Sequence, residues 1–252
     1  MTNKTIIESQ RTAKSWKRSG GSIYRKIFLY FFITLVAIIY ILPVLGVVLT
    51  SFKLDAEIAK EGLWSIPKVL HLDNYKEIWI EANVQTYIKN SFFVTIPATF
   101  FSIVLGILMG YVFSKLPFKG SEMLFIFVLA GMFFPPLIVL IPLFKFYNKI
   151  QLYDTLWPMI ITHVAFGLPI CTLIMRNFFS SIPMAIREAA IMDGANEFEI
   201  LVKIMLPVSL PALAVLATLQ FTWIWNDFLF PIIFTQSDNM RTVMVGLISM
   251  KG

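Results

Sequence analysis

Five apolar runs, each free of Asp, Glu, Lys and Arg, dominate this chain. They cover residues 27–49, 91–113, 123–144, 155–175 and 208–226. Roughly 20 apolar residues in a helix cross the hydrocarbon core of a bilayer, so each run is long enough to span a membrane. Backbone amides need partners in hydrocarbon, and runs of this length satisfy them as helices. The pattern predicts an all-α, polytopic transmembrane helix bundle with five spans.

Composition and charge indicate the class of protein and its orientation in the membrane. The chain is 58% hydrophobic and only 14% charged, which excludes an ordinary soluble domain. Residues 1–26 carry seven Lys or Arg against one acid, Glu8, and no small-residue cleavage site follows, so we expect a retained first helix behind a basic cytoplasmic arm. Alternation then places 176–207 in the cytoplasm and 50–90 outside. The net charge of +6 is a topology signal, and residues 27–252 are predicted to form one transmembrane domain.

The long polar stretch between the fourth and fifth runs, about residues 181–207, predicts a pair of short helices. Pro183 suits the first turn of a helix, which we expect to run to about Asp193. Gly194 tolerates a left-handed backbone and is a natural place for that helix to stop.

A second helix is predicted directly after this turn. Asn196 followed three residues later by Glu199 has the spacing of a capping box, and Pro207 is expected to end the helix. Four apolar positions have the spacing of one helical face: Phe198, Leu201, Val202 and Met205.

Two interpretations of this helix pair remain open from the pattern alone. It is either an amphipathic hairpin that rests on the bilayer or a docking element. Ala189 and Ala190 have little side-chain bulk and would let a partner approach the backbone closely, and Glu188 offers a charge for a specific contact. These features favour docking.

The stretch resembles the EAA loop of ABC-transporter permeases, through Glu188-Ala189-Ala190, Gly194 and Ile204-x-Leu206-Pro207. Further matching motifs extend the resemblance over nearly the whole chain, including Ser51-Phe52-Lys53, Asp73-Asn74-Tyr75, Asn90-Ser91, Phe118-Lys119-Gly120, Ile141-Pro142-Leu143, Ser181-Ile182-Pro183 and Trp225-Asn226-Asp227-Phe228. They point to the binding-protein-dependent sugar importers, similar to the second permease of maltose-type systems. Arg187 departs from the family, where many relatives carry an acid.

The resemblance implies a mechanism, partners and a location. The loop would couple this chain to a cytoplasmic ATPase through Glu188, Ala189, Ala190, Asp193 and Gly194. The implied partners are a second permease, two ATPase subunits and an extracytoplasmic sugar-binding protein, in the plasma membrane of a bacterium or archaeon. No Gly-rich phosphate loop is present, so ATP and Mg are expected on the partner ATPase, with no cofactor, metal or enzymatic activity in this chain.

The family usually has six spans, whereas this sequence offers five. After Asp227 only residues 242–250 form an uncharged run, which is too short to cross a bilayer. We therefore expect the last transmembrane helix of the family to be missing, in a truncated product, a fragment or a natural short form.

Candidate pathway residues lie in and just after the fifth run: Gln220, Trp223, Asn226 and Asp227. Aromatic rings and hydrogen-bonding groups together suit a carbohydrate, and an ionisable residue at membrane depth is a functional candidate. The alternative is that Asn226 and Asp227 lie at the outer interface and bond a neighbouring helix. His163 is expected to be a hydrogen-bonded packing residue.

Two other functions remain open. A permease of the same build for polyamines or inorganic anions would share the loop. An intramembrane hydrolase would need a nucleophile and a base in contact, and His163 with Cys171 is the one pair available. Cys171 lies within a span without a partner for an intramolecular disulfide or a metal site.

Overall fold

The computed structural model describes residues 23–80 and 83–249, and every regular element in these ranges is helical. The all-α prediction is confirmed. The described residues group into two compact units, within Met1–Lys76 and Glu77–Gly252, where the sequence predicts one transmembrane domain over 27–252. Most of the predicted basic arm lies outside the described residues.

The first unit begins with one long apolar helix. α2 (Ile23–Ser51) contains the first predicted span, and it is followed by α3 (Asp55–Glu61) and the start of α4 (Asp73–Ile80). Because α2 is apolar on all sides, it has the composition of a helix that is surrounded by lipid or by other helices.

Two of the motifs that carry the family resemblance meet in this unit. The Lys53 side chain is only 2% exposed, and its Nζ donates to the carbonyl oxygen of Gly62 at 3.2 Å and to Ser65 Oγ at 2.8 Å. Asn74 Nδ2 donates to the carbonyl oxygens of Ser51 and Lys53 at 3.1 and 2.9 Å. A buried lysine needs such partners, so these motifs fix the fold of the segment after α2.

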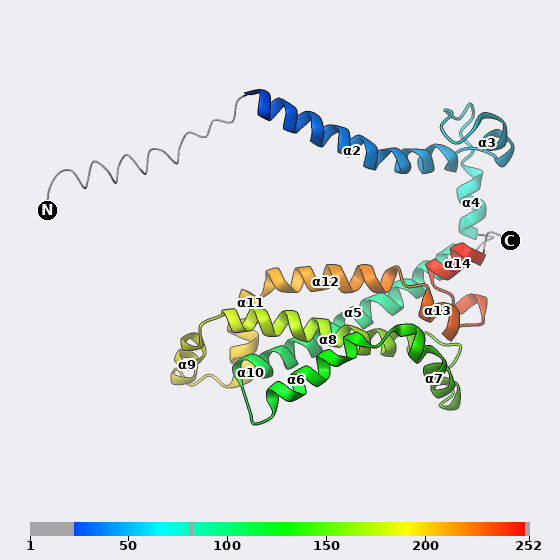
Figure 1. Cartoon of the computed structure of the whole chain (residues 1–252). Coiled ribbons are helices and arrows are strands. Elements are labelled where there is room, and N and C mark those ends of the chain that lie inside the picture. The colour runs from blue at the N-terminus through cyan, green and yellow to red at the C-terminus, as the bar shows by residue number, and fades with distance from the viewer. Residues whose placement is uncertain (1–22, 81–82, 250–252) are drawn as a thin grey trace, which may run out of the picture. The chain divides into compact units, whose positions relative to one another are not determined.

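Three helices form the body of the second unit: α5 (Val84–Lys115), α8 (Trp157–Ser181) and α12 (Leu210–Trp225) (Figure 1). α5 and α8 run parallel. α12 runs antiparallel to α8, because its first half packs with the second half of α8 and its second half with the first half of α8. These directions are those expected of the second, fourth and fifth spans of an alternating chain.

Glycines permit the closest approach between α5 and α8. A Cβ added to Gly106 would lie 2.4 Å from Cys171 Cβ, and one added to Gly110 would lie 2.7 Å from Met175 Cβ and 2.8 Å from the Arg176 backbone nitrogen. The Gly-x-x-x-Gly pattern thus brings two backbones together, as small residues do between membrane helices.

The third predicted span, 123–144, is not one straight helix. α6 (Ser121–Ala130) and the 3₁₀ turn η1 (Gly131–Phe133) meet α7 (Pro136–Lys149) at 95°. Pro136 lacks an N–H and disfavours helical backbone at the residue before it, so the tandem prolines break the helix. Three described helices are long and apolar enough to cross a membrane, or up to five if each of two bent pairs is one span.

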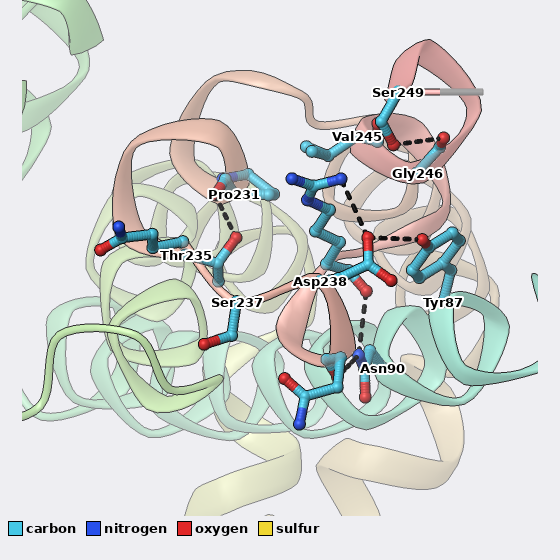
Figure 2. A network of polar contacts seen from close by, with 12 residues as sticks. Tyr87, Asn90, Pro231, Thr235, Ser237, Asp238, Val245, Gly246 and Ser249 are labelled. Atoms are coloured by element: carbon cyan, nitrogen blue, oxygen red, sulfur yellow. Dashed lines mark hydrogen bonds and ion pairs between the residues drawn. The ribbon is translucent and has the colours of Figure 1, made fainter. Parts of the chain in front are cut away.

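The C-terminal part consists of α13 (Leu229–Phe234), the 3₁₀ turn η3 (Asp238–Met240) and α14 (Val243–Ser249). Figure 2 shows how side chains tie this part to α5: Tyr87 Oη donates to Asp238 Oδ1 at 2.8 Å, and Asn90 Nδ2 donates to the Asn239 carbonyl oxygen at 2.8 Å. These bonds hold the turn between α13 and α14 against the start of α5.

Candidate functional site

The polar stretch after α8 folds as the sequence predicts in its first half. α9 (Met184–Met192) follows Pro183 directly, and the chain turns at Gly194 with φ of +86°. Left-handed backbone of this kind is unfavourable for other residues, so the turn depends on glycine. α9 lies at the end of the second unit that is opposite α13 and α14 (Figure 1).

The second helix begins as predicted but its buried face differs. Asn196 and Glu199 form both bonds of the capping box at the start of α10 (Glu197–Ile200). The helix continues through a π-helical segment, η2 (Leu201–Met205), into α11 (Leu206–Val208), where the chain bends by 79° into α12.

The predicted apolar face over Phe198, Leu201, Val202 and Met205 is therefore only half right. Leu201 and Met205 are buried with Ile200, whereas Phe198 and Val202 are exposed. The wider π turn changes which side chains share a face. Pro207, which cannot donate a backbone hydrogen bond, is the second residue after this segment, and the helix ends one residue beyond it.

Polar contacts join α9 to α10 and hold this part of the chain against α5. Arg187 forms an ion pair with Glu197, and Tyr111 Oη of α5 donates to Glu197 Oε2 at 2.6 Å. Lys115 Nζ, buried at the end of α5, donates to the Ile182 carbonyl oxygen at 2.5 Å. The hydrogen bond from Arg187 holds the pKa of Glu197 below its ordinary value. Sequence reasoning missed this network, and Arg187 entered only as a departure from the family.

The five predicted coupling residues do not all face outward. Glu188, Ala189, Asp193 and Gly194 are exposed, but Ala190 is only 6% exposed and packs into the core of its own chain. Its small size lets α9 approach Ile200 and α8. Of the two predicted coupling alanines, Ala189 is the one that remains exposed on α9.

A second feature is a pocket of about 260 Å³ at the break between α6 and α7. Aromatic and apolar side chains from this break, α8, α12 and α13 form most of its wall, including Met132, Phe134, Phe166, Trp223 and Phe230. Broken helices at membrane depth are tolerated where they line a cavity or are buried in protein. The irregular backbone at Pro135-Pro136 therefore lies beside this pocket.

Three of the four predicted pathway residues line this pocket: Gln220, Trp223 and Asp227. Gln220 is buried, with Nε2 at 3.4 Å from the Gly167 carbonyl oxygen, and Trp223 is 68% exposed. Asn226 is not among the lining residues, because its Nδ2 donates to the Thr222 carbonyl oxygen of its own helix at 2.8 Å.

Asp227 has a structural partner as well as a place in the pocket wall. Its carboxylate accepts the backbone N–H groups of Leu229 and Phe230 at 3.0 and 3.2 Å and so caps the start of α13. His163 Nε2 lies 3.3 Å from Asp227 Oδ2 but makes no hydrogen bond with any described residue. The expectation that His163 is a hydrogen-bonded packing residue is wrong for this atom.

The pair needed for an intramembrane hydrolase does not form. Cys171 is buried and its Sγ accepts from Gln220 Nε2 at 3.4 Å, while His163 faces Asp227. Eight residues of one helix separate them, a rise of about 12 Å. No base therefore reaches this thiol from His163.

Comparison with known proteins agrees with the fold and with the family resemblance. The family model of binding-protein-dependent transport system inner membrane components matches residues 102–251. The probable ABC transporter permease YurM of Bacillus subtilis is 31% identical over 246 residues, which are 98% of this chain and 79% of that protein. The arabinooligosaccharides transport permease AraQ of Halalkalibacterium halodurans is 34% identical over 215 residues, 84% of this chain and 76% of its own length.

Two further similarities extend the comparison. The diacetylchitobiose uptake permease NgcG of Streptomyces coelicolor is 32% identical over 211 residues, 84% of this chain and 70% of that protein. The crystal structure of a bacterial ABC transporter involved in the import of alginate superposes with a TM-score of 0.79 at 23% identity, covering 92% of this chain and 81% of that one. This chain belongs to the family of binding-protein-dependent transport system inner membrane components, and it is a membrane-spanning permease subunit.

Proposed function

We propose that this chain forms half of a carbohydrate pathway in an ATP-driven importer, and that α9 is its contact with a cytoplasmic ATPase. The relatives named for diacetylchitobiose and arabinooligosaccharides support a carbohydrate cargo. The observation that carries the coupling role is the exposed face of α9, with Glu188 and Ala189 outward while Arg187 and Ala190 bind the helix to its own chain.

Such a surface can transmit force because it is rigidly attached. The ion pair between Arg187 and Glu197 joins α9 to α10, the bond from Tyr111 joins α10 to α5, and the bond from Lys115 joins α5 to Ile182 just before α9. A displacement of α9 is thereby passed to α5 and, through the glycine contacts, to α8. A bound ATPase shifts the conformational equilibrium of this chain only by contacting its two states with different free energies, and α9 would provide that contact.

The complete transporter would contain a second permease, two ATPase subunits and an extracytoplasmic binding protein. ATP and Mg would be bound by the ATPase subunits. The basic arm before α2 would lie in the cytoplasm with α9, and the pocket, at the opposite half of α8, would lie toward the binding protein. The membrane would be the plasma membrane of a bacterium or archaeon.

Charge in the pocket separates this cargo from the alternatives. The described residues that line the pocket include no Lys or Arg, which disfavours an inorganic anion. Asp227 would suit a cation, but it is the one Asp or Glu among the described lining residues, whereas a polyamine carries several positive charges. Aromatic walls with a few polar groups are typical of a small-molecule site.

The test uses the transporter assembled with its partner subunits in proteoliposomes. Uptake of maltotriose, arabinotriose and diacetylchitobiose is compared with uptake of spermidine and phosphate, and we expect at least one sugar to be transported. Glu188→Lys and Gly194→Pro should abolish uptake and weaken co-purification of the ATPase. Lys149→Glu, an exposed charge change at the opposite end, serves as the control. Undiminished uptake in both α9 variants, or uptake of spermidine or phosphate alone, refutes the proposal.

A further inference from the structure

Among the described polar side chains, His163 is unusual because its Nε2 is buried and lacks a hydrogen bond. The residue is 8% exposed, lies in the first half of α8 and lines the pocket. Buried polar atoms almost always have a partner, and one without a partner calls for a physical explanation.

The nearby carboxylate does not supply that explanation. Asp227 Oδ2 is 3.3 Å from His163 Nε2, but the angles do not make a hydrogen bond. Both carboxylate oxygens are already used by backbone N–H groups at the start of α13. A buried ion pair offsets its desolvation cost only when the geometry is good, so this pair is poorly suited to act as a structural clamp alone.

The surroundings hold the imidazole firmly in place. The ring of Phe230 contacts His163 edge to face with centroids 5.2 Å apart, and Phe166 packs on Phe230 at 5.5 Å. A fixed ring with a free nitrogen at a pocket wall is arranged to bind a group that enters the pocket. Asp227 retains acceptor capacity, since each carboxylate oxygen has two lone pairs and accepts one backbone hydrogen bond here.

We propose that His163 and Asp227 together bind adjacent hydroxyl groups of one sugar ring, so that this chain carries a carbohydrate subsite of its own. The inference rests on the proposed function. A hydroxyl both donates and accepts, so it pairs with either tautomer of the imidazole and with the carboxylate. The pocket volume of about 260 Å³ lies just below the range usual for small-molecule sites, which suits one ring of an oligosaccharide. Trp223 and Phe134 supply apolar walls for its C–H face.

Variants of the assembled transporter separate a binding role from a structural one. His163→Phe keeps an aromatic ring but cannot hydrogen-bond, and it should reduce uptake of the transported sugar about tenfold. His163→Gln retains a donor and an acceptor and should recover most of that loss. Thr162→Val, which removes the neighbouring bond to Tyr147 on another face of α8, is the matched control and should transport normally.

Protection of a pocket thiol from labelling by bound sugar gives an independent readout. A role of His163 in packing alone would not produce such protection. In a Cys171→Ser background, Met132→Cys in the pocket wall is labelled with a small methanethiosulfonate, with and without maltotriose, arabinotriose or diacetylchitobiose, whichever the wild-type transporter takes up. We expect the sugar to slow labelling at position 132, to slow it less when His163→Phe is added, and to leave Lys149→Cys unaffected.

The outcomes distinguish this inference from the proposed function. Wild-type sugar uptake together with normal uptake by His163→Phe, or equal labelling with and without sugar, overturns the subsite and leaves the carbohydrate importer standing. Absence of sugar uptake by the wild-type transporter, with uptake of spermidine or phosphate, overturns both. If the transporter with His163→Phe fails to assemble, sugar uptake by His163→Gln and the labelling result test the subsite instead.

Discussion

Replacing Gly106 with valine is expected to force α5 and α8 apart. The first added atom, Cβ, would lie 2.4 Å from Cys171 Cβ and 2.9 Å from the Cys171 carbonyl carbon. Carbon atoms pack at about 3.5–4.0 Å, so the helices must separate by about 1 Å or more. The carbonyl carbon belongs to the backbone and cannot rotate away. Separation of the backbones is therefore the only relief.

The expected loss of stability comes from packing, because the change in helix propensity contributes little. Glycine and valine differ by only a few tenths of a kcal/mol as helix residues. Overpacking typically costs about 1–3 kcal/mol, and a contact with backbone belongs at the upper end. We expect Gly106→Val to lower the unfolding temperature of the assembled transporter by about 5 °C or more.

The assay is thermal unfolding of the purified complex in detergent, with two companion variants. Gly46→Val in α2 is the control, because a Cβ there meets only the ring tip of Trp64 at 3.2 Å, which can move. Cys171→Gly removes the nearest obstructing atom and should restore part of the stability of Gly106→Val, with a coupling free energy of about 1 kcal/mol. Equal stability of Gly106→Val and Gly46→Val, or no recovery with Cys171→Gly, would refute this account of the α5–α8 contact.

Three further predictions concern the polar contacts. The pKa of Glu197 lies below its ordinary value of 4.5 because Arg187 donates to it, so its stabilising contribution is present above pH 4.5 and is lost as the pH falls through the lower, folded-state value. The difference in unfolding temperature between wild type and Glu197→Gln should therefore shrink in acid, and a constant difference contradicts the pairing. Asn196→Ala removes the capping box and should destabilise α10 by about 1 kcal/mol, seen as faster proteolysis of the α9–α10 stretch; unchanged cleavage would refute the cap. Lys53→Met removes the hydrogen bond that the Leu63 carbonyl oxygen accepts from Lys53 Nζ and should make the segment after α2 more sensitive to protease, whereas wild-type resistance would show that this buried lysine is dispensable.

Much of the fold could be predicted because the length and composition of a membrane helix can be recognised in the sequence. α2 and α5 contain the first and second predicted runs, α8 covers the fourth except residues 155 and 156, and the Gly194 turn lies where predicted. These features depend on local rules: the thickness of hydrocarbon, the need to pair backbone amides and the backbone freedom of glycine.

The remaining features depend on contacts between distant residues. The bend at Pro136 divides the third predicted span into two helices, and its angle is set by the helices around it. The π-helical segment changes the buried face, which a regular 3.6-residue period cannot anticipate. Ala190 faces inward because Ile200 returns beneath α9, and no local pattern states which of two adjacent alanines is buried.

The candidate sites show the same division. The positions of Glu188 and Gln220 could be selected from motifs, but the network of Arg187, Glu197 and Tyr111 joins residues far apart in the sequence. The sequence favours a packing role for His163, because histidine in an apolar helix usually has one. Only the three-dimensional structure shows that its Nε2 faces a pocket without a partner.

Cross-linking from α9 tests the central claim most directly. In a Cys171→Ser background, Met192→Cys places a thiol on a side chain that is 86% exposed at the end of α9, and Lys149→Cys places one at the opposite end of the second unit. A thiol-to-amine cross-linker applied to the assembled transporter should join position 192, but not position 149, to the ATPase subunit. A cross-link from position 149 alone, or from position 192 to the extracytoplasmic binding protein, would contradict the account.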